Sequence, residues 1–534
     1  MKENETHTSE GWASRVGLIL AVASGAIGLG NFLRFPGQAV QNGGGAFMVP
    51  YIVSFLILGI PVCMAEWSMG RMGGKHGHST PFIFREYLKG FPLKLSGAIG
   101  VMIPVMIYVY YVFIESWCLA YAYYFLTGQI SFGNVSPNEI TKASSSFFLD
   151  LTGARANGES FESPIMVFFL VCFLINFFLV YRGLSKGLEA FAKIAMPIMG
   201  ICATIILIRV LTLPGIETGL ATMWNPDWSK LVEPNEWPKV WVSAAGQVFF
   251  SLSTGFGIAL VFSSFLKKKD DVVLSSLSSA SLNEFAEIVF GGMITIPVAF
   301  LFLGSLATSF GTFGMGFIAL PAVFLQMSFG SFFGGLWYLM LFLAALTSSI
   351  TMLQPGVLFL EEGFRIGRKK SSSLLFFFTF ALCLPIIYFN KDFTALDIAD
   401  FYIGTIMIYI LASIQIFIFC FKIGVDRGAD HANEGSIIPF PKIIRFILKY
   451  ITPWFLLIVF LAFCYLNVPD YVLKMDPDHM GSIAELKGDN VEDARTKAYI
   501  ARYVLISLVL IFGFLFFLVS KALKNRERVE SHEF

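Results

Sequence analysis

The sequence predicts an all-α polytopic membrane protein with about 12 transmembrane helices. Of its 534 residues, 56% are hydrophobic and 14% are charged, whereas a soluble domain carries roughly 25% charged residues. The apolar runs last about 20 residues without the alternation of a β-barrel strand, so they predict membrane-spanning helices. The net charge of +1 gives no basic footprint, and we expect no nucleic-acid partner.

The apolar runs follow one another along the whole chain and set the predicted order of the helices. The first run covers about residues 13–40 and is centred on Gly28. The stretch 308–327 is too rich in glycine to span, and it predicts a re-entrant or capping outer loop. The other predicted helices are centred on Ile57, Tyr110, Leu174, Pro197, Ser253, Gly292, Ser348, Phe380, Met407, Phe455 and Val509.

The first apolar run is interrupted in its middle. Gly25, Gly28 and Gly30 weaken the helix by roughly 1 kcal/mol each relative to alanine, and Asn31 and Arg34 follow them. An Arg inside a membrane costs at least ~2.5 kcal/mol on insertion scales. Close packing of two helices would explain the glycines, but it does not explain the polar residues. The pattern favours a broken helix that lines a polar cavity.

The sixth run repeats this anomaly. Ser251, Ser253 and Thr254, followed by Gly255 and Gly257, lie in the middle of the span. Interrupted segments at corresponding positions of two halves indicate the binding site of a transporter. The spacing predicts two inverted five-helix repeats, 13–211 and 238–423, with helices 11 and 12 appended over 443–522. The predicted tails are 1–12 and 523–534.

Lys and Arg residues gather on alternate loops and orient the chain. Clusters near 71–89, 182–186, 267–269, 365–370, 422–445 and 521–528 predict the cytoplasmic side, which places both termini in the cytoplasm. The intervening loops, about 128–164, 213–236, 308–327 and 468–496, are poor in basic residues and predict the outer side. Seven cysteines in or beside apolar segments predict small core side chains rather than disulfides or a metal site. No cleavable signal peptide is evident.

A broken membrane helix offers backbone groups that can bind ions. Its N–H ends attract a carboxylate, its carbonyl ends attract a cation, and hard cations prefer oxygen ligands. Each side-chain oxygen in the spans could instead make an ordinary interhelical hydrogen bond worth ~0.6 kcal/mol. Their grouping beside two breaks favours an ion site. The oxygens come from Asn31, Ser251, Asn283, Thr347 and Ser348.

Longer motifs carry a family resemblance. GLGNFLRFP at 28–36 is followed by NGGGAF at 42–47, GQVFFSLS at 246–253, LNE at 282–284 and LTSS at 346–349. These motifs resemble the neurotransmitter:sodium symporter family, nearest to its bacterial leucine transporter, over nearly the whole chain. The resemblance implies a LeuT-type fold of five-plus-five inverted repeats with helices 1 and 6 unwound at mid-membrane. It also implies the cell (inner) membrane of a bacterium.

The resemblance implies two sodium ions as cofactors. At the first site, the substrate carboxylate would complete a shell made by the Ala26 carbonyl and the side chains of Asn31, Ser251 and Asn283. The second site would consist of the carbonyls of Ser24, Ile27 and Ala344 and the hydroxyls of Thr347 and Ser348.

The resemblance also implies an amino-acid pocket with an apolar lining. No acid or base faces it, and a charged side chain would be buried without a partner, so we expect a neutral, hydrophobic amino acid. Gly28 stands where amine-transporting relatives place an Asp, which argues against a monoamine. Backbone N–H groups near Leu29 and Gly30 and the Tyr111 hydroxyl would bind the carboxylate. The implied pocket residues are Gly25, Ala26, Leu29, Gly30, Ile107, Tyr111, Phe250, Ser251, Ser253, Phe256, Ser348 and Met352.

The same resemblance implies gates on both sides of the pocket. Arg34 and Asp400 would form the outer gate with Phe256 as a lid; the alternative is a permanent salt bridge. At the inner end, Ser9 replaces the usual basic residue opposite Glu362, so the usual ion pair is missing and the inward-open state should be easier to reach. Glu66 is expected to bind the unwound backbone of helix 6.

Glu287 stands where chloride-dependent relatives have a small neutral residue. A fixed carboxylate there, near Tyr51 and Gln247, can replace the charge of the halide. We therefore expect chloride independence, with proton counter-transport if Glu287 is protonated during the cycle. The alternative is a structural Glu held by neighbouring helices.

These features favour a sodium-coupled symporter that works by alternating access in the lipid bilayer. An ion channel and a sodium-independent amino-acid transporter on the same fold are the alternatives. A membrane enzyme is disfavoured because the sequence has no HExxH motif. The sequence leaves the preferred amino acid and the oligomeric state open.

Overall fold

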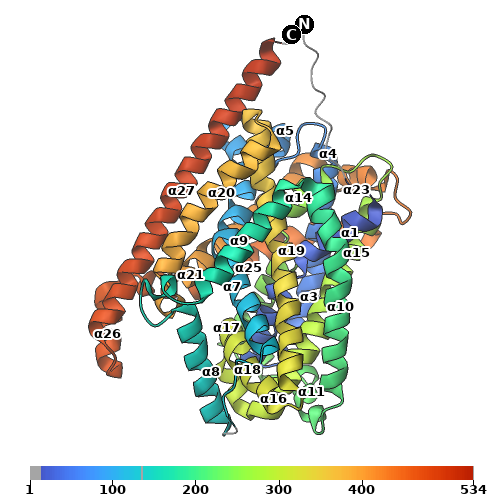
Figure 1. Cartoon of the computed structure of the whole chain (residues 1–534). Helices are drawn as coiled ribbons and strands as arrows, with labels where there is room; N and C mark the ends of the chain where they lie inside the picture. The colour runs from blue at the N-terminus through green and yellow to red at the C-terminus, as the bar shows by residue number, and fades with distance from the viewer. Residues whose placement is uncertain (1–11, 13, 89, 134–135, 533–534) are drawn as a thin grey trace.

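The computed structural model describes residues 12, 14–88, 90–133 and 136–532. Within these ranges every regular element is a helix, and the one β-contact is an isolated bridge between Gly44 and Pro226. The predicted all-α class is confirmed. Figure 1 shows a bundle of helices with α27 (Val491–His532) as a long helix along one side.

The first half of the chain starts with a bent pair of helices. Short π-helical or 3₁₀ segments, labelled η, join or extend several α-helices. The elements are α1 (Arg15–Ala26), η1 (Gly30–Arg34), α2 (Phe35–Gln41), α3 (Gly45–Ser54), η2 (Phe55–Gly59), α4 (Ile60–Gly73), α5 (Thr80–Tyr87), α6 (Phe91–Lys94), η3 (Leu95–Ala98), α7 (Ile99–Leu126), α8 (Pro137–Thr152), η4 (Glu159–Phe161), α9 (Ile165–Tyr181), η5 (Leu184–Glu189), α10 (Ala190–Leu211), α11 (Ile216–Trp224) and α12 (Ser229–Val232).

The second half starts with another interrupted helix. Its elements before α27 are α13 (Trp237–Leu252), α14 (Ile258–Ser263), α15 (Val272–Phe285), η6 (Ala286–Gly292), α16 (Met293–Leu303), η7 (Gly304–Ser309), α17 (Thr312–Gly314), η8 (Met315–Ala319), α18 (Leu320–Gln326), α19 (Gly330–Phe364), α20 (Arg368–Tyr388), η9 (Lys391–Phe393), α21 (Thr394–Phe401), η10 (Tyr402–Met407), α22 (Ile408–Phe417), η11 (Ile418–Gly424), α23 (Val425–Asn433), α24 (Lys442–Tyr450), α25 (Thr452–Lys474) and α26 (Pro477–Lys487).

Nine helical stretches in the described part of the chain are long and apolar enough to cross a membrane, and the bent pair α1–α2 makes a tenth. The count of twelve is not reached on this criterion. The two missing spans are α9, with 17 residues, and α13, with 16, which fall short of the roughly 20 residues that a straight span requires. The chain is a multi-pass membrane protein.

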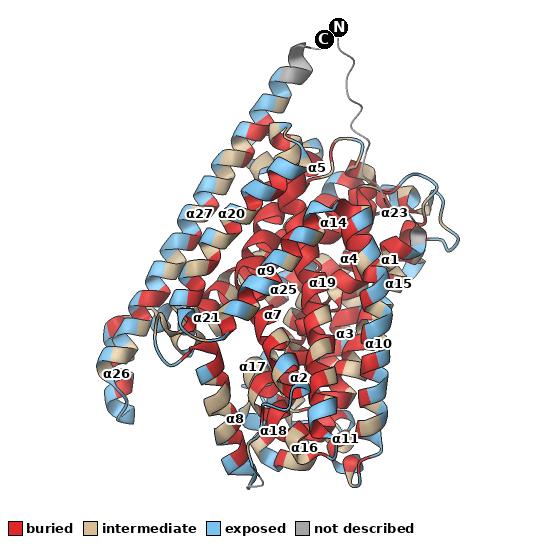
Figure 2. Ribbon diagram, in the orientation of Figure 1, coloured by how far each residue is buried: buried red, intermediate tan, exposed pale blue. Residues whose placement is uncertain are grey.

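The core lies around α7 and α19, which are buried along most of their length (Figure 2). Helix α27 lies along one side of the bundle (Figure 2), and many side chains of α25 and α27 are exposed. A helix that is apolar on all sides is buried in the centre of a membrane protein, whereas lipid covers the outer face of a peripheral one.

The helical ribbon is interrupted at both places where the sequence breaks its apolar pattern. Helix α1 ends at Ala26 and regular structure resumes at Gly30, with a bend of 46° between the two parts. Helix α13 ends at Leu252, and α14 begins at Ile258. In the second gap, Gly255 and Gly257 have φ values of +76° and +83°, a left-handed conformation that glycine adopts without steric cost.

The stretch predicted as a re-entrant or capping loop consists of short helices over Thr312–Gln326. It packs against the second half of the first span, because a Cβ at Gly37 would lie 3.1 Å from the backbone of Thr312. The stretch is too short to span.

Candidate functional site

The two breaks meet at a buried polar cluster centred on Asn31. The Asn31 Nδ2 donates to Ser251 Oγ at 3.1 Å and to Asn283 Oδ1 at 3.0 Å. Asn283 Nδ2 in turn donates to Ser251 Oγ at 2.8 Å. All three side chains are at most 1% exposed. The structure therefore brings together the three side chains that were expected to bind the first sodium ion, although up to 252 residues separate them in the chain.

Glu287 completes this cluster. Its Oε2 accepts from Asn31 Nδ2 at 3.2 Å and from the Ser251 hydroxyl, and its Oε1 accepts from Gln247 Nε2 at 2.6 Å. The side chain is fully buried, and no Lys or Arg of the described chain forms an ion pair with it. A buried carboxylate without a basic partner requires a proton or a cation. The cluster offers several oxygen ligands and lacks one positive charge, and both properties fit a sodium ion.

Tyr51 lies close to Glu287, as the sequence led us to expect, and its hydroxyl donates to Glu284 Oε2 at 3.0 Å. Glu284 had appeared only as part of a motif. Because it lies one residue after Asn283 on the same helix, it adds a second carboxylate near the cluster.

The break in the first span releases backbone carbonyls. In a continuous helix the Gly28 N–H would donate to the Ser24 carbonyl and the Leu29 N–H to the Gly25 carbonyl. Instead, Gly28 N donates to Asn31 Oδ1 at 2.9 Å and Leu29 N donates to the Tyr111 hydroxyl at 3.1 Å. The Ser24 hydroxyl donates to the Ala21 carbonyl within α1, and the Ser24 carbonyl is one of the oxygens that the break releases.

The residues expected at the second sodium site lie on α1 and α19, which pack against each other. The hydroxyls of Thr347 and Ser348 both donate to the Ala344 carbonyl, at 2.9 and 3.1 Å. A Cβ at Gly28 would lie 2.5 Å from Ser348 Oγ, which shows how closely the break approaches α19. The hydroxyls and the released carbonyls are thus oxygens of the kind that a sodium ion requires.

The expected substrate pocket lies beside the first break. The ring of Phe250 packs against Gly30, where a Cβ would lie 2.9 Å from the ring, and contacts Phe256 edge-on with centroids 6.0 Å apart. Ile107 on α7 and Met352 on α19 are at most 4% exposed. Ser253 ends α13 with a φ of +51°. Ala26 is the last residue of α1, directly before the break.

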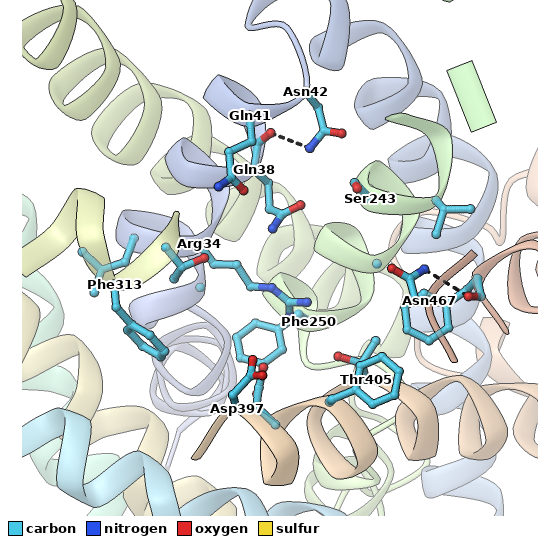
Figure 3. A pocket seen from close by; sticks show the side chains of 18 of the residues that line it. Arg34, Gln38, Gln41, Asn42, Ser243, Phe250, Phe313, Asp397, Thr405 and Asn467 are labelled. Carbon is cyan, nitrogen blue, oxygen red and sulfur yellow. Dashed lines mark hydrogen bonds between the residues drawn. The ribbon is translucent and has the colours of Figure 1, made fainter. Parts of the chain in front are cut away.

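A cavity of about 650 Å³ opens next to this pocket and is lined by Leu29, Gly30, Arg34, Tyr111, Phe250 and Asp400, among others. In Figure 3 the Arg34 side chain extends over Phe250, and its guanidinium carbon lies 4.3 Å from the ring centroid. Phe256 is 1% exposed and does not line the cavity. The geometry therefore places Phe250, rather than Phe256, between the cavity and the buried cluster.

Arg34 and Asp400 face the same cavity, but they do not form an ion pair within 4.0 Å in this structure. Asp400 Oδ1 accepts from the Tyr110 hydroxyl at 2.8 Å. One guanidinium nitrogen of Arg34 is buried without a hydrogen-bond partner in the described chain. The sequence marked Tyr110 only as the centre of a predicted helix, and no local signal links it to Asp400, 290 residues away.

Two buried glutamates hold the scaffold around the breaks. Glu66 Oε1 accepts from the backbone N–H of Gly255 at 2.9 Å, which confirms that Glu66 binds the interrupted backbone between α13 and α14. Glu115 on α7 accepts from Asn176 on α9 at 3.0 Å and from Ser349 on α19 at 2.5 Å. These contacts tie the central helices to one another.

At the opposite end of the bundle, Glu362 acts as a helix cap. It accepts from the backbone N–H groups of His78 at 2.6 Å and of Ser79 at 2.8 Å, directly before α5. The His78 ring stacks on Phe265 with centroids 3.9 Å apart, and burial lowers the pKa of His78. Ser9, the expected partner position of Glu362, lies outside the described residues.

The comparisons with known proteins agree with this geometry. The model of the sodium:neurotransmitter symporter family matches residues 9–169 and 149–474. A sodium-dependent transporter of Methanocaldococcus jannaschii is 31% identical, over 80% of this chain and 85% of its own. The sodium-dependent serotonin transporter of Drosophila melanogaster is 28% identical, over 85% of this chain and 76% of its own.

Among solved structures, the crystal structure of MhsT in complex with L-phenylalanine superimposes with a TM-score of 0.73. It is 28% identical, and the match covers 85% of this chain and 99% of that one. Together with the family model, which covers most of the described helices, these similarities show that the chain belongs to the sodium:neurotransmitter symporter family.

Proposed function

We propose that the protein couples the inward movement of sodium to the uptake of a neutral, hydrophobic amino acid. Sodium-coupled symport follows from the family, which consists of transporters rather than enzymes. The substrate class is supported by the apolar side chains of Ile107, Phe250 and Met352. It is also supported by Gly28, which brings no carboxylate to pair with the ammonium of an amine. MhsT, the structural relative, was crystallised with L-phenylalanine.

The observation that carries the proposal is the buried cluster of Asn31, Ser251, Asn283 and Glu287. Its oxygens lie where two interrupted helices meet, and one negative charge there has no basic partner in the described chain. We propose the first sodium ion at this cluster, with the Ala26 carbonyl and the substrate carboxylate as further ligands. The second ion would use the carbonyls of Ser24, Ile27 and Ala344 and the hydroxyls of Thr347 and Ser348.

The substrate would lie between this cluster and the outer cavity. Its carboxylate would be bound by backbone N–H groups near Leu29 and Gly30 and by the Tyr111 hydroxyl. Phe250 would close over it, and Arg34, which has a guanidinium nitrogen without a partner in the described chain, would then pair with Asp400. Access would alternate between this cavity and the cytoplasmic end. By the positive-inside rule, both termini would also lie at this cytoplasmic end. The membrane would be the cell (inner) membrane.

The test is uptake of radiolabelled leucine and phenylalanine into proteoliposomes, with and without an inward sodium gradient. Accumulation should require sodium and should be abolished by Asn31→Ala. Thr347→Ala removes a proposed ligand of the second ion and should weaken the sodium dependence. Ser24→Ala is the matched control, because it keeps the carbonyl and should transport normally. Uptake indifferent to sodium in the parent protein would overturn both ion sites.

We also propose that Glu287 makes transport independent of chloride. Its ionised carboxylate would supply a negative charge beside the first site, where chloride-dependent relatives need a halide. Replacing chloride with gluconate should leave uptake by the parent protein unchanged, whereas Glu287→Ser should create a chloride requirement. A Glu287→Ser variant that transports equally in both anions would favour a purely structural role. If Glu287 exchanges a proton during the cycle, an outward proton gradient, with the vesicle interior acidic, should accelerate sodium-driven uptake in the parent and not in Glu287→Gln.

A further inference from the structure

A second large cavity lies at the end of the bundle that carries α5 and α23 (Figure 1). Its volume is about 820 Å³, and its walls come from the ends of α4 and α5 on one side and from α22, η11 and α23 on the other. It shares no lining residue with the cavity that contains Arg34 and Asp400. The positive-inside rule assigns this end to the cytoplasm.

The cavity is strongly basic. Lys75, Lys422 and Arg427 line it, together with His76 and His431. The one carboxylate in the lining is Glu86, whose Oε2 lies 3.6 Å from His76 Nδ1. Lys75, Lys422 and Arg427 form no ion pair with any residue that the structure describes. By contrast, Arg445 and Lys449 on the neighbouring α24 pair with Asp426 and Asp430. Three cations therefore face one cavity whose lining holds a single carboxylate.

The walls of the cavity are held in place by a side chain that does not line it. Arg71 on α4 donates to the carbonyls of Asp270 at 2.9 Å and Glu434 at 2.7 Å, and also to the carbonyl of His431. These bonds tie α4 to the C-terminal end of α23. The cationic groups thus lie on elements that are fixed relative to one another, so a ligand would meet a site that is largely formed in advance.

The other part of the lining is apolar and open. Leu93 is 56% exposed and Phe417 is 46% exposed, and both line the cavity beside the cations. Lys422 Nζ lies 5.6 Å from the centroid of the Phe417 ring, so the charged and the apolar surfaces are adjacent. A soluble phosphate would use only the cations. An amphiphile with an anionic head would use both surfaces.

We propose that this cavity binds an anionic phospholipid of the cytoplasmic leaflet. Its phosphate would lie among Lys75, Lys422 and Arg427, and its acyl chain would run over Leu93 and Phe417. Basic pockets between membrane helices on the cytoplasmic side are suited to such head groups. The site is separate from the transport pathway proposed above and does not depend on it.

The test uses the full chain purified in a neutral detergent. Short-chain phosphatidylglycerol, the matching phosphatidylcholine and glycerol 1-phosphate are titrated separately, and the bound fraction is measured by native mass spectrometry. Phosphatidylglycerol should bind at least about tenfold more tightly than either of the others. Each Lys or Arg near an anionic head contributes about fivefold in affinity, so the triple variant Lys75→Gln, Lys422→Gln, Arg427→Gln should bind phosphatidylglycerol about a hundredfold more weakly.

Two further variants separate the charged and the apolar parts. Lys449→Gln removes a cation that is paired with Asp426 outside the cavity, and it should leave the affinity unchanged. Phe417→Ala should weaken binding of phosphatidylglycerol without affecting glycerol 1-phosphate. Equal binding of the two lipids, or a triple variant that binds like the parent, would overturn the site. Glycerol 1-phosphate binding as tightly as phosphatidylglycerol would overturn the assignment to a lipid.

Discussion

Replacing Asn31 by Asp tests the charge of the buried cluster directly. The Asn31 nitrogen that would become a carboxylate oxygen lies 3.2 Å from Glu287 Oε2. Two unit charges at that separation repel by about 5 kcal/mol at an effective dielectric constant of roughly 20. The other oxygen would still accept from the Gly28 N–H, so the break itself should keep its shape.

A penalty of this size corresponds to a loss of roughly three to four orders of magnitude in any equilibrium that requires both carboxylates to be ionised. We therefore expect Asn31→Asp to reduce sodium-driven uptake at neutral pH to near background. The repulsion disappears if the second charge is removed. The double variant Asn31→Asp, Glu287→Gln again has one carboxylate in the cluster, and it should recover uptake at least about a hundredfold relative to Asn31→Asp.

The assay is the initial rate of leucine uptake into proteoliposomes as a function of sodium concentration. Glu287→Gln alone is the control for loss of the native charge, and the melting temperature of each variant in detergent checks folding. If the double variant folds but stays as inactive as Asn31→Asp, repulsion between the two carboxylates is not the cause. An Asn31→Asp variant with parental uptake would show that the two groups are never ionised together in the transport cycle.

Three further predictions concern the cytoplasmic end and the backbone. Glu362→Ala removes the acceptor of two N–H groups, and hydrogen exchange at residues 78–80 should accelerate at least about tenfold, since a hydrogen bond to a charged group contributes ~1.5–3 kcal/mol; unchanged exchange would refute the cap. Burial lowers the pKa of His78 below its ordinary value of about 6.5, so the buried neutral imidazole contributes stability above that pH, and this contribution is lost as the pH falls through the lowered pKa. The melting temperature should therefore fall more steeply between about pH 7.5 and about pH 5 in the parent than in His78→Phe. Parallel curves would show that His78 is not buried as the neutral imidazole. Gly44→Ala should lower the unfolding free energy by at least ~1–3 kcal/mol, because Gly44 has a φ of +58° and a Cβ there would collide with the carbonyl of Thr222; Gly367→Ala, where no atom lies within 4 Å of the added Cβ, is the control with no expected change.

The length of the apolar runs was sufficient to predict the fold class, because about 20 consecutive apolar residues have few stable alternatives to a membrane helix. The same reasoning did not secure the count of spans. Helices α9 and α13 are shorter than a full span, and α13 ends at the break that interrupts the sixth apolar run. The positions of the two breaks were visible in the sequence, because glycines and hydroxyl side chains weaken a helix wherever it packs.

Which side chains meet at those breaks depended on tertiary structure, apart from what the family resemblance implied. Asn31 and Asn283 are 252 residues apart, and no periodic pattern connects them. Phe250 and Phe256 are equally apolar, yet only Phe250 lines the outer cavity, because the left-handed residues Ser253 and Gly255 redirect the chain between them. Arg34 lies over the Phe250 ring, whereas Asp400 accepts a hydrogen bond from Tyr110, and neither contact is visible in the sequence.

The sequence by itself thus determined where this protein is apolar, where its helices break and which oxygens are available, since these depend on local composition. Only the tertiary structure decided that Asn31, Ser251, Asn283 and Glu287 share one buried site and that Glu362 caps α5. Contacts between distant segments depend on how the helices pack, and the packing is a property of the whole bundle rather than of any one stretch.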